Sequence, residues 1–114
     1  MKYLLLLLCF AAISCQPTAT DKQQLIRDLS IAYKSCKDHD RKTTATYTKD
    51  AYVIYKRCHE LVGQPLSDAK LCFPDLTYKA DSGEYIASFR GMFTTVICIR
   101  TDNSGIITAT EVTD

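Results

Sequence analysis

The first periodic pattern of apolar residues begins just after position 20 and predicts an amphipathic helix. Thr20 and Gln23 have the spacing of a capping box, in which a hydroxyl side chain caps the helix and an amide lies three residues further on. Apolar residues then recur at steps of four, three and four, the period of one helix face: Leu25, Leu29, Ala32 and Cys36. We therefore expect this face to point into the core.

A second periodic segment runs from about Thr48 to Val62 and predicts a second helix. Its apolar face consists of Ala51, Ile54, Cys58 and Leu61. The β-favouring run 52–55 leaves a strand as the alternative, but Gly63 and Pro65 follow as a usual helix stop, and the in-phase apolar positions favour a helix. The polar stretch 37–44 is expected to be a loop, short enough for the two helices to pack antiparallel.

The pattern after Gly63 changes from helical to alternating. Residues 67–73 predict about two helical turns that end at Pro74. Three β-rich runs follow, of which the first alternates with Tyr85, Ala87 and Phe89 on one side; the runs cover residues 84–89, 92–100 and 106–112. Residues 102–105 form an Asp-Asn-Ser-Gly turn, so the last two strands should make a hairpin.

These elements predict one α+β domain: an N-terminal antiparallel helix pair, then a short helix and a small antiparallel sheet that ends in a hairpin. The expected domain covers residues 21–114, because the first fifteen residues have the layout of a signal peptide. Lys2 precedes an apolar run from Leu4 to Ile13, about half the length needed to span a bilayer. Residues 16–20 would form a polar tether between the signal segment and the domain.

The residue at position 15 decides between two destinations. Residues 12–15, Ala-Ile-Ser-Cys, resemble the lipobox of bacterial lipoproteins, which implies cleavage before Cys15 and a lipid on its thiol. The protein would then sit on the periplasmic face of a bacterial membrane, held there by this anchor alone. The alternative is cleavage after Cys15, which would leave Gln16 as the N-terminus of an extracellular protein.

The mature chain would keep an even number of cysteines, which in an exported protein implies disulfides. These four are Cys36, Cys58, Cys72 and Cys98. The antiparallel helix pair favours a bond between Cys36 and Cys58, and the short helix and the hairpin favour one between Cys72 and Cys98. The other two connectivities stay open on sequence alone, and four buried free thiols are the alternative to disulfides.

The charges are balanced overall but unevenly placed. Residues 22–58 carry nine basic and four acidic side chains, whereas residues 60–114 carry four basic and eight acidic ones. The basic half could face an acidic partner or lipid head groups, or it could simply be a solvated surface. We expect no nucleic-acid partner.

The order of residues from Val62 onward resembles the small bacterial lipoproteins of the SmpA/OmlA (BamE-like) type, whose fold also occurs in β-lactamase inhibitory proteins. The resemblance covers residues 62–112. It rests on Val62-Gly63, the helix at 67–71, the Leu-Cys-Phe-Pro-Asp turn at 71–75 and the turn at 103–105, with Cys72 in place of the family's turn glycine. It implies a non-enzymatic envelope protein that binds other proteins, and it assigns no binding residue.

Candidate chemistry is sparse. His39 and His59 are the side chains that could exchange protons near neutral pH, and with a lysine they would suit a small secreted ribonuclease. A helix dipole explains a histidine in a last helical turn equally well. A metal site from His39, Asp40, His59 and Glu60 would need two helix ends to meet, so we expect no metal and no cofactor.

Six tyrosines and no tryptophan remain once Tyr3 is removed with the signal segment. Tyrosine is favoured at protein interfaces, and Tyr52 and Tyr55 flank the apolar face of the second helix, although packing at the edge of a small core is the alternative. The sequence therefore predicts an exported, non-enzymatic protein that binds an unidentified protein partner, as an inhibitor, immunity factor or assembly subunit. The alternatives are a freely secreted effector-type protein and the ribonuclease.

Overall fold

The structure, a computed structural model, describes residues 19–38, 44–90 and 94–114, with the backbone alone for residues 19–20 and 44–48. The expected signal segment with Cys15, the first part of the tether, and His39 and Asp40 lie outside these ranges. Among the described residues, no helix combines the length and the apolar character needed to cross a membrane.

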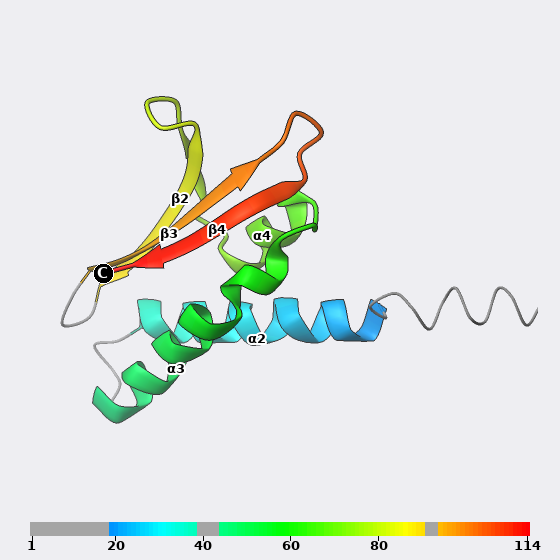
Figure 1. Cartoon of the computed structure of the whole chain (residues 1–114). Helices are drawn as coiled ribbons and strands as arrows, with labels where there is room; N and C mark the ends of the chain where they lie inside the picture. The colour runs from blue at the N-terminus through cyan, green and yellow to red at the C-terminus, as the bar shows by residue number, and fades with distance from the viewer. Residues whose placement is uncertain (1–18, 39–43, 91–93) are drawn as a thin grey trace, which may run out of the picture.

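The N-terminal half is the predicted antiparallel pair of helices (Figure 1). Helix α2 spans Ala19–Lys37, and helix α3 spans Thr44–Arg57. Two side-chain contacts fix their register: Arg57 bonds to Asp28 near one end of the pair, and Ser35 bonds to Asp50 near the other. The helices are therefore antiparallel along their whole described contact.

The helix boundaries differ from the prediction in three places. Helix α2 begins at Ala19, so the last two tether residues are helical and Thr20 is not the cap. Helix α3 begins at Thr44, inside the expected loop. It ends at Arg57, and the expected last turn is a 3₁₀ helix, η2, at Cys58–Leu61. Helix ends commonly tighten in this way, and the apolar face continues through η2.

The C-terminal half holds a short helix and a four-stranded antiparallel meander. Helix α4 covers Leu66–Cys72, close to the predicted residues 67–73. The strands are joined in sequence order: β1 at Thr77–Lys79, β2 at Glu84–Arg90, β3 at Thr94–Thr101 and β4 at Ile107–Thr113. Strands β3 and β4 form the predicted hairpin, in which Asp102 Oδ1 accepts hydrogen bonds from the backbone N–H groups of Ser104 (2.8 Å) and Ile106 (3.0 Å).

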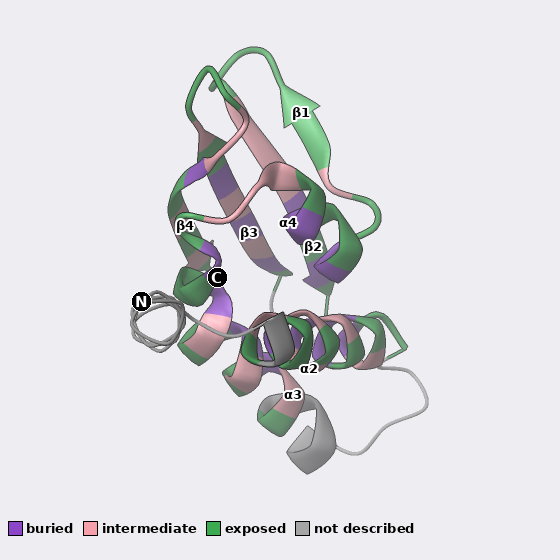
Figure 2. Ribbon diagram, turned by 90° about the vertical axis from the view of Figure 1, so that its right-hand side faces the viewer, coloured by how far each residue is buried: buried purple, intermediate pink, exposed green. Residues whose placement is uncertain are grey.

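The helices cover one face of the sheet: α4 lies against it, and α2 lies below α4 and packs against the end of β2 through Tyr33 and Phe89 (Figure 2). The alternation of β2 is as predicted, since Ala87 and Phe89 are buried and Tyr85 packs at the edge of the core. In β3, Ile97 and Ile99 are buried in the same core. The alternate residues of β2 and β3 lie on the opposite face of the sheet, and they include Ile86, Val96 and Cys98. The predicted α+β class is confirmed, with a helical layer packed on one face of an antiparallel sheet.

The exit from η2 is joined to the start of β4. The backbone N–H of Gly63 donates to the carbonyl of Ile107 (2.8 Å), and the N–H of Ile107 donates to the carbonyl of Gln64 (2.8 Å). Gly63 has φ of 91°, a left-handed conformation that glycine adopts without strain. This glycine therefore ends the helical half and turns the chain into α4 beside the sheet.

Candidate functional site

Two exposed tyrosines of the helical half lie on the outer side of α3. Ala51, Ile54 and Cys58 face the core, so the opposite side of this helix faces solvent. The exposed residues on that side and at its two ends are Lys49, Tyr52, Tyr55, Lys56 and His59, which we call the α3 surface. The Tyr52 side chain is 59% exposed and that of Tyr55 39% exposed. The sequence placed both tyrosines beside the apolar face, and the structure turns them outward.

The two tyrosines are held in different ways. The ammonium group of Lys56 lies 5.4 Å from the centroid of the Tyr52 ring, a cation–π contact. The Tyr55 hydroxyl donates to the carboxylate of Asp114, whose Oδ1 also accepts a hydrogen bond from Thr95 Oγ1 (2.9 Å). Tyr55 thus links α3 to the sheet, whereas Tyr52 projects into solvent with a basic neighbour.

The charge of the α3 surface is basic. Arg57 lies beside it but is turned toward two carboxylates, Glu60 at 3.0 Å and Asp28 at 2.5 Å, and hydrogen bonds to these groups raise the pKa of its guanidinium. Lys49 and Lys56 are exposed, and His59 continues the stripe onto η2. A solvent-facing stripe of tyrosine and lysine is the result.

The histidine hypotheses stay predictions. His59 is exposed on η2, and His39 and Asp40 lie outside the described residues, so the structure does not test the proposed ribonuclease pair or metal set. In the described ranges, no group of three His, Cys, Asp or Glu side chains is placed to hold a metal ion.

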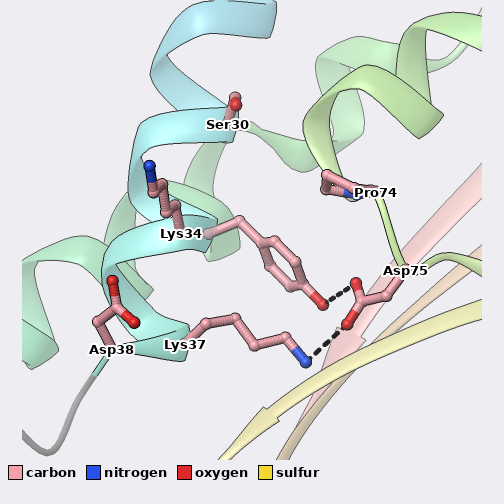
Figure 3. Close-up of a pocket in the computed structure, with 7 residues that line it drawn as sticks. Ser30, Lys34, Lys37, Asp38, Pro74 and Asp75 are labelled. Carbon is pink, nitrogen blue, oxygen red and sulfur yellow. Dashed lines mark hydrogen bonds and ion pairs between the residues drawn. The ribbon is translucent and has the colours of Figure 1, made fainter.

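A second feature is a cavity of about 380 Å³ between the C-terminal half of α2 and the loop after α4 (Figure 3). At its floor, the Tyr33 hydroxyl donates to Asp75 Oδ1 (2.5 Å), and Lys37 Nζ lies 2.7 Å from Asp75 Oδ2. No local pattern in the sequence predicts this cluster, which joins residues 42 positions apart. Ser30, Lys34, Asp38 and Pro74 complete the lining.

The ionisation of this cluster is set by its contacts. Partial burial works to raise the pKa of Asp75, but hydrogen bonds from Lys37 and Tyr33 outweigh it and hold that pKa below its usual value. Burial, followed by the hydrogen bond to Asp75, raises the pKa of Tyr33. At neutral pH the cluster is a carboxylate between a neutral phenol and an ammonium group, and it fastens α2 to the loop after α4.

Replacing Tyr33 by Phe should raise the pKa of Asp75 toward its ordinary value of about 4, because one of its two hydrogen-bond donors is lost. The lowered pKa of Asp75 contributes stability above its unfolded pKa, and this contribution is lost as the pH falls through the folded pKa. The variant should therefore be less stable by about 1 kcal/mol at pH 7, and the difference should shrink at acid pH. A carboxyl NMR titration and urea unfolding at two pH values measure both effects.

The matched control is Tyr78→Phe, which removes a hydroxyl from an exposed tyrosine on β1. It should change stability by less than about 0.5 kcal/mol at either pH. An Asp75 pKa that does not move in Tyr33→Phe would contradict the assigned hydrogen bond.

The positions of the cysteines in the fold do not favour the two disulfides that the sequence favoured. Cys36 lies near the end of α2 and Cys58 follows the end of α3, so antiparallel packing puts them at opposite ends of the helix pair. Cys72 is in the core on α4, whereas Cys98 lies on the open face of the sheet beside Glu84 and Arg100. Neither expected pair can meet without rearrangement.

The fold and this surface define a small α+β protein with one open sheet face and an exposed tyrosine and lysine stripe. Comparisons with models of protein families, with curated proteins and with solved structures find no match. They lend no support to the resemblance of residues 62–112 to the SmpA/OmlA type of lipoprotein.

Proposed function

We propose that this chain is an exported, non-enzymatic protein that acts by binding another protein through the α3 surface. Its leader, with Cys15 at the expected lipidation site, supports a lipoprotein on the periplasmic face of a bacterial membrane, and free secretion is the alternative. The N-terminal peptide of protein isolated from its host separates these two destinations: acylated Cys15 supports the first, and a start at Gln16 opposes it.

The observation that carries the proposal is the exposure of Tyr52. It is an aromatic side chain 59% open to solvent on a rigid helix, and its position is held by Lys56 rather than by the core. Tyrosine buries a large area for a small loss of conformational freedom, which is why it is enriched at the energetic centres of interfaces. Tyr55, one turn further on, provides a second aromatic contact.

The charges around Tyr52 indicate the chemistry of the partner. Lys49 and Lys56 flank the ring one turn away on either side, and Arg57 is already paired with Asp28 and Glu60. An acidic surface on the partner would meet these two ammonium groups, and such pairs raise the rate of encounter and depend on salt. The uneven charge along the chain agrees with this, because the α3 surface belongs to its basic half.

The test is the substitution Tyr52→Ser in a tagged full chain expressed in its own host. We expect the amount of partner protein captured by this variant to fall at least tenfold below that captured by the unmodified chain. An aromatic residue at the centre of an interface commonly contributes about 2 kcal/mol to the binding free energy. The melting temperature should stay within about 2 °C, because an exposed side chain adds little to stability. Quantitative mass spectrometry of the captured protein and thermal unfolding measure the two effects.

Tyr78→Ser is the matched control, because Tyr78 is a comparably exposed tyrosine on β1, far from α3 in the fold. It should capture the partner as the unmodified chain does. Equal capture by Tyr52→Ser and the unmodified chain, with purified partner as well as with extract, would overturn the assignment of the α3 surface. Binding that does not depend on salt concentration would overturn the proposal that the partner presents an acidic surface.

A further inference from the structure

Of the cysteines Cys36, Cys58, Cys72 and Cys98, the first three are fully buried, and Cys58 and Cys72 lie close together in the core. The contact between Arg57 and Asp28 fixes the level at which α3 ends beside α2. Cys58 directly follows Arg57 and is fully buried, and its thiol lies close enough to that of Cys72 to affect the pKa of Cys72. Ile26 packs against that core as well.

Cys72 contacts α2 at the turn that contains Ile26. It is the last residue of α4, and its Sγ lies 3.9 Å from the backbone carbonyl oxygen of Ile26. Burial, the neighbouring Cys58 thiol and Asp68 raise the pKa of Cys72 to about 12. Burial also raises the pKa of Cys58 to about 12, against a hydrogen bond with Thr110 that lowers it. The two thiols are thus neighbours in the core.

The other two cysteines are too far from this place. Cys36 lies ten positions beyond Ile26 on α2, about 15 Å along the helix axis at 1.5 Å per residue. Disulfides join residues whose Cα atoms are less than about 7 Å apart. Cys98 lies on the opposite face of the sheet, since its neighbours Ile97 and Ile99 face the helices.

We propose that Cys58 and Cys72 form a disulfide in the mature protein and that Cys36 and Cys98 stay outside it. The proposal rests on the export proposed above, because an oxidising compartment must supply the oxidant. That oxidant is itself a disulfide, carried either by a small molecule or by another protein. One cysteine thiolate attacks this disulfide and releases one of its thiols. The second thiolate then attacks the resulting mixed disulfide and releases the other thiol. Two protons and two electrons leave the chain, and the oxidant is reduced to two thiols.

The burial of both thiols sets the time at which this bond forms. The thiolate is the reactive species, and a pKa of about 12 for each group leaves little of it in the folded protein. Oxidation is therefore expected during folding, before α4 closes over the core. The bond then joins η2 to α4 and encloses residues 59–71, the segment that carries the turn at Gly63.

Tryptic mapping tests the pairing, because trypsin places the four cysteines on separate peptides. Cleavage after Arg57 and Lys70 gives residues 58–70 with Cys58, and cleavage after Lys79 gives residues 71–79 with Cys72. Protein isolated from its host, unfolded in denaturant, alkylated without reductant and then digested, should yield these two peptides joined. Cys36 and Cys98, on residues 35–37 and 91–100, should be alkylated.

Two variants make the test quantitative in protein refolded with oxidised and reduced glutathione. A disulfide that closes a loop of this length should raise the melting temperature by roughly 10 to 20 °C over the reduced form. Cys98→Ser should keep that difference, whereas the double variant Cys58→Ala and Cys72→Ala should lose it. Alkylation of both Cys58 and Cys72 in native and in refolded protein would overturn the proposal, and so would a linkage of either one to Cys36 or Cys98. Neither result bears on the binding test with Tyr52→Ser.

Discussion

Replacing Phe73 by Ala is expected to lower the free energy of unfolding by about 3 to 5 kcal/mol, the usual cost of deleting a buried aromatic ring. Phe73 follows α4 and is fully buried. Its ring packs edge to face against Tyr33, with centroids 5.1 Å apart, and Tyr33 also packs edge to face against Phe89 at 6.1 Å. Phe73 thus connects α4, α2 and the sheet through one aromatic cluster.

The measurement is urea unfolding of the purified chain, with the melting temperature as a second readout. A loss of this size in a domain of this length corresponds to a fall of at least about 12 °C. Since small domains are stable by roughly 5 to 15 kcal/mol, the variant could be largely unfolded at 37 °C.

Two neighbours serve as controls for Phe73→Ala. Phe73→Leu keeps most of the buried volume and should lose about 1 to 2 kcal/mol, although it removes the edge-to-face contact. Leu71→Ala lies two residues earlier on α4, where the side chain is exposed, and should change stability by less than about 0.5 kcal/mol. Equal effects of Leu71→Ala and Phe73→Ala would contradict the described packing of α4.

The part of this fold that could be predicted from sequence is the part encoded in local periodicity. Leu29 and Cys36 on α2, and Ile54 and Leu61 on α3 and η2, were expected in the core from their spacing, and all four are buried. The burial of one helix face or one strand face repeats every few residues, so it leaves a regular mark on the sequence. The hairpin turn at residues 102–105 was recognised for a similar reason, because its residue types are tied to its backbone conformation.

The rest depends on how elements sit against one another, and local patterns do not record that. Antiparallel packing was predicted, yet the favoured pairing of Cys36 with Cys58 ignored their levels along the two helices, which the contact of Arg57 with Asp28 shows. The cluster of Tyr33 and Asp75 joins α2 to a loop from the other half of the chain. In the sequence, Tyr33 and Asp75 each resemble an ordinary surface or edge residue. Their contact in the folded structure is therefore the first evidence that they join α2 to this loop.

A second large effect is expected where α2 meets α4 through a buried charge. Lys22 Nζ lies 2.8 Å from Asp68 Oδ2, and the Asp68 side chain is 10% exposed against 37% for Lys22. The contact is an ion pair without hydrogen-bond geometry, since Oδ2 has no hydrogen-bond partner in the described part of the chain. A carboxylate in this position depends on the nearby ammonium group to offset its lost hydration.

Lys22→Met should lower the free energy of unfolding by about 2 to 3 kcal/mol, because it leaves the buried carboxylate of Asp68 without this partner. The cost is set below the roughly 3 to 5 kcal/mol typical of fully buried pairs because the Lys22 side chain is partly hydrated. The double variant Lys22→Met and Asp68→Leu should recover most of the loss, since it removes the uncompensated charge and leaves apolar groups in its place. Urea unfolding of the single and double variants measures the recovery.

The pair of Lys37 and Asp75 provides the control for burial, because its lysine is also on α2 and its separation is nearly the same, 2.7 Å, while the Asp75 side chain is 51% exposed. Lys37→Met should lose no more than about 1 kcal/mol, and that loss should decrease in high salt, as expected for solvated charges. The loss in Lys22→Met should depend less on salt, because Asp68 is shielded from solvent. If the two variants lost the same free energy with the same salt dependence, the burial of Asp68 would not be the source of the effect, and the contact of α2 with α4 would be no stronger than a surface ion pair.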